Sequence, residues 1–187
     1  MKDSLKILLA VIAAIVVVGM MIGGSYNSLV ELEENVEKEY SNVSIMLERR
    51  ADLIPNLVNT VKGYVAHEEA VITRITEARA SLLNADDIEE KAAANNELTS
   101  ALNALMVIVE NYPDLKANVN FIQLSDELAG TENRIANARR DYNDAVETYN
   151  SKVKKFPTNI LANMFDFEEA DYFEVDPAKT EVPEVEF

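Results

Sequence analysis

Histidine is the side chain that most often serves as a general base or metal ligand, and this sequence has one, His67. A di-iron centre in a helical bundle needs a Glu-x-x-His pair on each of two helices, but Tyr64 stands three positions before His67. A serine nucleophile would also need a histidine base with an evident partner. Because Glu68 and Glu69 follow directly, His67 is interpreted as part of a solvated helix face.

Other motifs of catalytic and cofactor sites are also missing from the sequence. The chain has no cysteine, which excludes disulfides, thiolate metal ligands and a cysteine nucleophile. It has no glycine-rich nucleotide-binding pattern and no EF-hand loop. Adjacent acidic residues such as Glu33 and Glu34 would point about 100° apart on a helix, so they would not share a site. We therefore expect no catalytic residue, no metal and no cofactor, and no enzymatic activity.

The composition describes an acidic protein that favours long helices. The 187 residues include 33 acidic and 17 basic side chains, giving a net charge of -16. Such a charge repels a phosphate backbone, so nucleic acid is not an expected partner. Hydrophobic residues make up 48% of the chain, and it has only 5 Gly and 5 Pro. This scarcity of turn residues favours long helices over many short strands.

The N-terminal segment is apolar enough to act as a membrane anchor over residues 1–25. Every residue from Ile7 to Ile22 is apolar or glycine, and Tyr26 could lie at the lipid interface. This length approaches the roughly 20 residues that cross a hydrocarbon layer of ~30 Å. A cleaved signal peptide is the alternative, because residues 23–25 are small. Helical patterning begins directly afterwards, which favours an anchor retained in the lipid bilayer.

The charges on either side of the apolar segment predict its orientation. Lys2 and Lys6 precede the segment, whereas three glutamates follow it at positions 31, 33 and 34. The positive-inside bias then places the N-terminus in the cytoplasm and the soluble part outside it, in a single-pass plasma-membrane protein. Gly19 and Gly23 form a G-x-x-x-G pattern, which either lets two membrane helices approach closely or reflects ordinary small residues in such a helix.

The pattern after the anchor predicts a first helix that ends near Arg50. Its apolar stripe runs from Tyr26 to Leu47. Asp52 would cap a second helix that holds Pro55 in its first turn, where a missing N–H does little harm. A continuous but kinked helix is the alternative.

Four apolar stripes together predict an all-α domain over residues 26–157. The stripes comprise Tyr26, Leu29, Val36, Tyr40, Val43 and Leu47; Ile54, Leu57, Val61, Val65, Ile72, Ile75 and Leu82; Ile88, Ala92, Leu98, Leu102, Leu105 and Val109; and Phe121, Leu124, Leu128, Thr131, Ile135, Ala138, Tyr142, Ala145 and Tyr149. Asp86 and Glu89 form a predicted capping box for the third helix. The fourth stripe is typical of a coiled-coil seam, although Gly130 lies within it. Short connections predict an antiparallel up-down-up-down four-helix bundle with long helices.

Residues 158–187 are predicted to form a short apolar helix and an acidic tail. Ile160, Leu161 and Met164 belong to the helix, which could cover one end of the bundle. The acidic stretch from Glu168 onward contains large apolar residues, so part of it is expected to lie along the bundle as an extended strap. Lysines 152, 154 and 155 could contact anionic headgroups or stabilise the end of the fourth helix.

The connections near Arg50 and Pro113 are predicted to meet at the end of the bundle farthest from the membrane. Loops on a rigid scaffold are common binding sites, so we expect a partner-binding surface there. Its residues are Arg49, Arg50, Asp52, Asn56, Tyr112, Asp114, Lys116 and Asn118. In the structural alternative, Asp52 and Asn120 cap helices and the arginines pair with carboxylates.

A long series of short segments resembles the signature of the LemA family. The segments are residues 49–58, 60–64, 67–68, 112–118, 120–121, 131–136, 138–139, 142–143, 149–150 and 156–157. The resemblance covers nearly the whole chain and implies a bacterial or archaeal protein with one N-terminal membrane helix and an antiparallel α-helical domain. Some relatives are linked to cell-envelope processes, antigen presentation or magnetosome membranes. The family supplies no established reaction and no catalytic residues.

These observations favour a membrane-anchored scaffold or adaptor that binds another protein of the cell envelope through a bundle surface. The alternative is a structural membrane protein that assembles with itself, through Gly19 and Gly23 or through bundles side by side. An enzyme that uses carboxylates and water would need a pocket that the sequence does not reveal.

Overall fold

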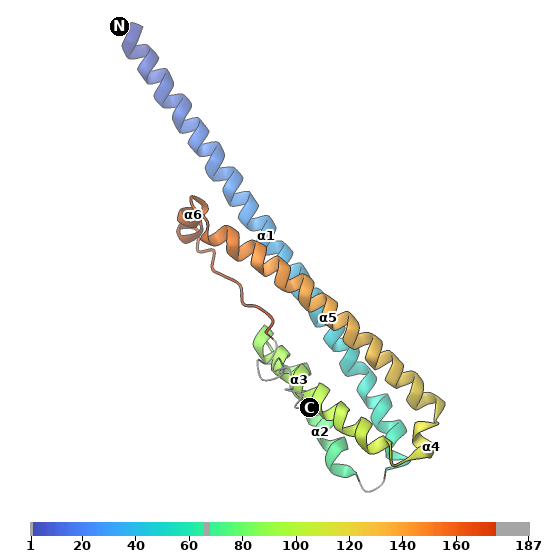
Figure 1. Ribbon diagram of the computed structural model, residues 1–187. Helices are drawn as coiled ribbons and strands as arrows, with labels where there is room; N and C mark the ends of the chain where they lie inside the picture. The colour runs from blue at the N-terminus through green and yellow to red at the C-terminus, as the bar shows by residue number, and fades with distance from the viewer. Residues whose placement is uncertain (1, 66–67, 175–187) are drawn as a thin grey trace, which may run out of the picture. The chain divides into compact units, whose positions relative to one another are not determined.

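The computed structural model describes residues 2–65 and 68–174, and every regular element in these ranges is a helix. The helices are α1 Lys2–Lys62, α2 Glu69–Asn84, α3 Ile88–Val109, α4 Pro113–Lys116, α5 Val119–Lys154 and α6 Thr158–Met164 (Figure 1). The predicted all-α class, the long N-terminal apolar helix and the short helix after the fourth stripe are therefore confirmed. His67 and the acidic residues after Glu174 lie outside the described residues.

The described residues form two compact units, the first made of residues 2–39 and 144–170 and the second of residues 40–143 and 171–174. The first unit packs around Leu29 of α1, Tyr149 of α5, Ala162 of α6 and Phe167. Partly buried apolar residues surround this cluster: Val30, Leu32, Val36, Val153 and Ala170. A small apolar core thus joins the middle of α1 to the end of α5 and to α6.

Residues 7–13 and 15–22 of α1 expose their apolar side chains instead of packing them. The exposed fraction is 66% at Ile7 and still 37% at Ile22. By length and composition this is the one described helix that could cross a membrane. Exposed apolar surface on this scale is typical of a segment that lies in lipid, which agrees with the predicted anchor.

The second unit is built from residues 40–62 of α1, the helices α2, α3 and α4, and residues 119–143 of α5. All predicted core residues from Ile54 to Val109 are buried, as are Phe121, Thr131, Ile135 and Tyr142 in α5. Tyr40 OH donates to the carbonyl of Asp86 just before α3, and Arg50 bonds to Asn95 within α3. Toward α5, the ring of Tyr40 packs against Tyr142, and Arg50 is ion-paired with Glu132. Within this unit α1 is therefore parallel to α3 and antiparallel to α5, as an up-down-up-down order requires.

The prediction that the first helix ends near Arg50 is wrong, because α1 continues through Pro55 to Lys62. Proline has no N–H, so the carbonyl of Ala51, four residues earlier, loses its usual helical donor. Arg79 of α2 supplies another donor, with Nε 2.7 Å from the Ala51 oxygen. Asp52 is exposed inside the helix and caps nothing.

Two further helix starts differ from the predicted ones. The α3 cap is Asp87, whose side chain accepts a hydrogen bond from Glu90 N at 2.8 Å, one residue later than the predicted capping box. The α5 cap is Asn118, whose Oδ1 accepts from Asn120 N at 2.9 Å and from Phe121 N at 3.1 Å. Starting the helices there places Ile88 and Phe121 in the core.

Two asparagines of α5 hold the extended chain that follows α6. In the first unit, Asn150 Nδ2 donates to Ala170 O at 2.8 Å and Asn150 Oδ1 accepts from Ala170 N at 2.9 Å. In the second unit, Asn143 makes the same pair of bonds with Phe173, at 3.2 and 2.9 Å. Each amide replaces a neighbouring strand as the partner of the backbone, so the predicted extended strap is present through Phe173.

Candidate binding groove on α1 and α5

The residues predicted to form one partner-binding surface lie on two different elements of the second unit. Arg49, Arg50, Asp52 and Asn56 are inside α1, whereas Tyr112, Asp114, Lys116 and Asn118 surround α4. The prediction that a connection near Arg50 meets the one near Pro113 is therefore wrong, because α1 does not end at Arg50. Partner binding by the exposed members of the set stays a prediction.

The turn that does meet the α4 segment is the one that follows α1. Asn118 Nδ2 donates to Tyr64 OH at 2.9 Å, and Tyr112 OH donates a long bond of 3.5 Å to Glu68 Oε1. Lys116 is ion-paired with Glu110 at 2.6 Å, and both of these side chains are exposed. These contacts give most of the α4 residues a structural role in the connection between α3 and α5.

A shallow, open groove of about 460 Å³ lies between α1 and α5 in the second unit. Its lining residues are Leu53, Asn56, Asn59 and Thr60 from α1 and Asn120, Gln123, Leu124 and Glu127 from α5. Four of these side chains are amides, and each amide carries two donors and an acceptor. Among the described residues no hydrogen bond engages the amide groups of these four side chains, so they are available to a partner.

The helical repeat explains why these polar side chains gather in one place. Residues 56, 59 and 60 of α1 are three and four positions apart, as are residues 120, 123 and 127 of α5, so each set lies on one helix face. The sequence contains this signal, but it points only to Asn56 and Asn120, as polar residues near the two expected connections. Finding the rest required the pairing of α1 with α5.

An ion-pair cluster borders the groove at Glu127. Arg49 Nη2 lies 2.6 Å from Glu127 Oε1, and Arg134 Nη1 lies 3.4 Å from the same oxygen. The hydrogen bond and charge of Arg49 lower the pKa of Glu127, and Arg134 adds to this effect. Glu127 therefore stays ionised, and its partner Arg49, with 53% of its side chain exposed, is accessible beside the groove.

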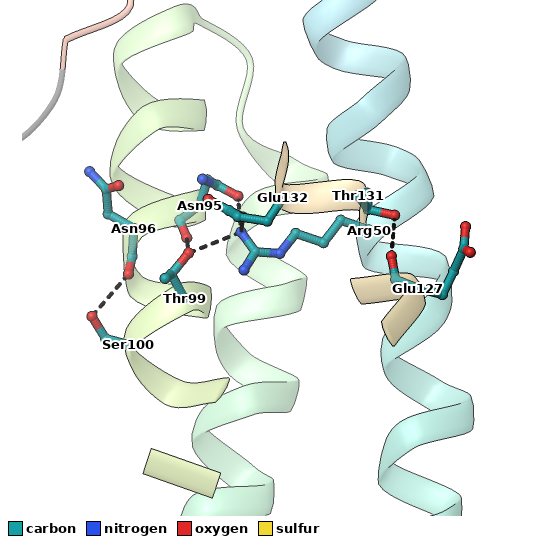
Figure 2. A network of polar contacts seen from close by, with 8 residues as sticks. All are labelled: Arg50, Asn95, Asn96, Thr99, Ser100, Glu127, Thr131 and Glu132. Carbon is teal, nitrogen blue, oxygen red and sulfur yellow. Dashed lines mark hydrogen bonds and ion pairs between the residues drawn. The ribbon is translucent and has the colours of Figure 1, made fainter. Parts of the chain in front are cut away.

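Arg50 points the other way and is only 4% exposed, so it is not a surface residue. Figure 2 shows its guanidinium reaching from α1 toward α3 and α5. Arg50 Nη1 donates to Asn95 Oδ1 at 2.5 Å and to Thr99 Oγ1 at 2.9 Å. The same nitrogen forms an ion pair with Glu132 Oε2 at 2.6 Å, although the two atoms are not aligned as a hydrogen bond. The network ties three helices together.

Burial lowers the pKa of Arg50, and the charge of Glu132 opposes that shift. Beside the pair lies a mostly apolar cavity of about 230 Å³, with Leu57, Leu102 and Leu128 among its lining residues. Within the described residues, Arg50 Nε has no hydrogen-bond partner. We assign this network a structural role, because the charged end of Arg50 is already bonded to side chains of α3 and α5.

Known proteins with similar sequences belong to one family and its relatives. The sequence model of the LemA family matches residues 39–187. Two magnetosome proteins of Paramagnetospirillum magneticum, MamQ 1 and MamQ 2, are each 30% identical over 179 residues, covering 82% of this chain and 66% of their own. Protein LemA of Metamycoplasma hominis is 29% identical over 144 residues, covering 76% of this chain and 66% of its own. The chain thus spans slightly less than two thirds of these relatives.

Proposed function

The chain belongs to the LemA family, and on that premise we propose that it is a membrane-anchored helical scaffold that binds another protein of the cell envelope. The observation that carries the proposal is the amide groove between α1 and α5. Amide side chains that are not bonded within the protein can pair with the backbone and polar side chains of a partner. Leu53 and Leu124 add apolar contact within the groove.

The link to the membrane supports a tethered scaffold over a free one. The apolar segment and the α1 wall of the groove belong to one uninterrupted helix, Lys2–Lys62. A partner that binds Asn56 or Asn59 would therefore contact the same helix that enters the lipid bilayer. The names of the compared relatives are not names of enzymes, which agrees with a binding role.

Site-specific crosslinking in living cells tests the groove. A photoreactive residue at position 59 or 123 should capture a protein partner, whereas one at Asn133, an exposed asparagine of α5 outside the groove, should not. Asn59→Arg with Gln123→Arg should abolish the capture from a probe at position 56, because two long cations fill a groove lined by amides. The matched control is Asn133→Arg, which should leave capture unchanged.

Equal capture at positions 59, 123 and 133 would contradict the proposal, as would capture that survives both arginines in a normally folded chain. The fold of each variant is checked by its helical circular dichroism. A partner that crosslinks only near α4, at Asp114 or Lys116, would move the binding surface to the residues predicted there.

Self-assembly is the second candidate function, and the exposure of the anchor favours it. Gly19 and Gly23 have open space where a Cβ would stand, so the helix backbone is accessible to a second helix at that point. The detergent-solubilised protein would then be an oligomer whose mass falls with Gly19→Leu and Gly23→Leu. A monomer at every concentration would leave the scaffold as the better account.

A further inference from the structure

The helix α6 and the residues beside it expose a group of large apolar side chains. Phe156 is 81% exposed, Ile160 57%, Met164 60% and Phe165 46%. Ile160 and Met164 are one helical turn apart and therefore share a face. The opposite side of α6 is buried, with Ala162 in the core of the first unit. The exposed apolar group is thus held in place by a packed helix.

This apolar group lies directly beside the end of the membrane segment. The ring of Tyr26 in α1 packs edge-on against Phe165 at 5.0 Å and against Phe167 at 5.6 Å. Both helices belong to the first unit, and Figure 1 shows α6 alongside α1. Tyr26 is four residues beyond Ile22, or about 6 Å along a helix, which is the depth of the headgroup layer next to the hydrocarbon.

Neighbouring charges show what kind of contact this group can make. Lys154, at the end of α5, is ion-paired with Glu169 at 2.5 Å. Asp166 and Glu168 are exposed in the segment after α6. Exposed Lys155 directly precedes Phe156, and Lys152 lies one turn earlier in α5. Charges of both signs therefore border the apolar group, and they give it no net preference for anionic lipid headgroups. Contact through the apolar side chains themselves is the interaction that fits.

We propose that Phe156, Ile160, Met164 and Phe165 form a second membrane contact, an apolar foot that enters the interface of the bilayer that α1 crosses. The occupant of this surface is lipid, because the surface adjoins the apolar span in one unit and is joined to it by Tyr26. A short in-plane helix of this kind buries its apolar face about 5–10 Å deep at the boundary of headgroups and acyl chains. The proposal rests on the membrane anchoring proposed above.

The absence of cysteine allows each position to be probed in the full chain after reconstitution into phosphatidylcholine vesicles. Single substitutions Ile160→Cys and Met164→Cys carry a small fluorophore, and lipids with a nitroxide near the glycerol or near the chain end quench it. Quenching should be strong with the nitroxide near the glycerol and weak with the one at the chain end. Adding phosphatidylglycerol or salt should not change it.

Two controls separate the possible outcomes. A label at Glu147→Cys, an exposed residue of the same unit seven residues before the end of α5, should not be quenched by either lipid. A label at Val17→Cys should be quenched most by the nitroxide at the chain end, and a failure there would overturn the anchor itself. Quenching at position 17 but not at 160 and 164 would leave the anchor and overturn the foot. Excitation transfer between labels at position 160 would assign the surface to a second copy and overturn the proposal.

Charge substitution gives an independent reading on the same vesicles. Ile160→Glu with Met164→Glu should withdraw position 156 from lipid, so a label at Phe156→Cys loses its quenching. Both substituted side chains are exposed, so helicity should be retained. Unchanged quenching at position 156 in a folded variant would contradict lipid contact through α6.

Discussion

At the scale of single residues, Pro55 is tolerated inside α1 because another helix replaces what proline lacks. A proline in a helix interior costs roughly 3 kcal/mol, partly through the carbonyl that it leaves without a donor. Here that carbonyl belongs to Ala51, which is fully buried and has no access to water. The bond from Arg79 Nε to this oxygen therefore removes a penalty that would otherwise break the helix.

We expect Arg79→Met to lower the free energy of unfolding by about 1–3 kcal/mol, the usual cost of a buried carbonyl without a partner. In a Pro55→Ala background the same substitution should cost less, because an alanine at position 55 supplies an N–H to the carbonyl of Ala51. Urea unfolding of the four chains of this cycle measures the coupling. Arg74→Met, an exposed arginine of the same helix, is the control and should change little. Equal costs of Arg79→Met in both backgrounds would contradict this account of Pro55.

The Arg50 network predicts a second change in stability. Arg50→Met removes the bonds to Asn95 and Thr99 and leaves Glu132 without its ion-pair partner. Glu132 is 39% exposed and can be hydrated, so the expected loss is about 2 kcal/mol, below the cost for a fully buried pair. Adding Glu132→Gln should recover part of the loss in thermal unfolding. No recovery would show that the ion pair contributes little.

Tyr149 gives the first unit a dependence on alkaline pH. Burial raises the pKa of its hydroxyl to about 12, and the nearby Glu33 and Glu168 add to the rise. Because the folded pKa lies above the ordinary value of 10.0, the stability from this group is complete below pH 10 and is lost as the pH rises toward 12.

Tyr149→Phe should therefore give a chain whose unfolding midpoint falls less steeply between pH 10 and 12 than that of the natural protein. Measuring urea midpoints across this interval tests the effect, with Tyr172→Phe, an exposed tyrosine, as the control. Identical slopes for the natural chain and the Tyr149→Phe variant would show that Tyr149 ionises without unfolding the unit.

At the scale of helices, the sequence predicted which faces are buried better than where helices end. Apolar periodicity is a local property, and it correctly placed Ile54, Leu98 and Ile135 in the core. Where a helix ends depends on partners that are distant in sequence. Arg79, for example, donates to the carbonyl of Ala51 and so allows α1 to continue through Pro55. The asparagine pairs with the extended strap were missed for the same reason. The sequence points to Asn56 and Asn120 but does not show that they share a groove with Asn59 and Gln123, because that depends on how α1 packs against α5.

Gly130 is a weakness of α5 that one substitution should remove. A Cβ at this position would meet only Arg134 Nη1, at 3.9 Å, which is an ordinary contact with a flexible side chain. Gly130→Ala should therefore stabilise the chain by up to about 1 kcal/mol, because alanine loses less backbone entropy in a helix. Thermal unfolding measures the gain. The reverse change at an exposed position of the same helix, Ala136→Gly, should lower stability, and a loss with Gly130→Ala would indicate a packing role for the glycine.

At the scale of the whole molecule, one helix carries both the apolar segment and residues of both compact units. The side of the membrane on which these units lie follows from how α1 inserts. Two lysines precede the apolar residues, and the first charged residues after them are acidic. Cationic flanks are retained in the cytoplasm, so the proposed scaffold would present its groove outside the cytoplasm.

This orientation predicts which side of the cell can label a unique cysteine. With no natural cysteine, Asn59→Cys should react in intact cells with a maleimide that cannot cross the plasma membrane. Reversing the flanking charges, by Lys2→Glu and Lys6→Glu together with Glu31→Lys and Glu34→Lys, should turn the helix around and protect the cysteine until lysis, because the cationic side is now the other one. Glu31 and Glu34 are both exposed, so their replacement tests topology with little effect on packing. A Lys38→Glu chain with the natural flanks is the control for altered charge alone and should label like the parent. Protection of position 59 in the parent chain would place the groove in the cytoplasm, where its partner would then have to be sought.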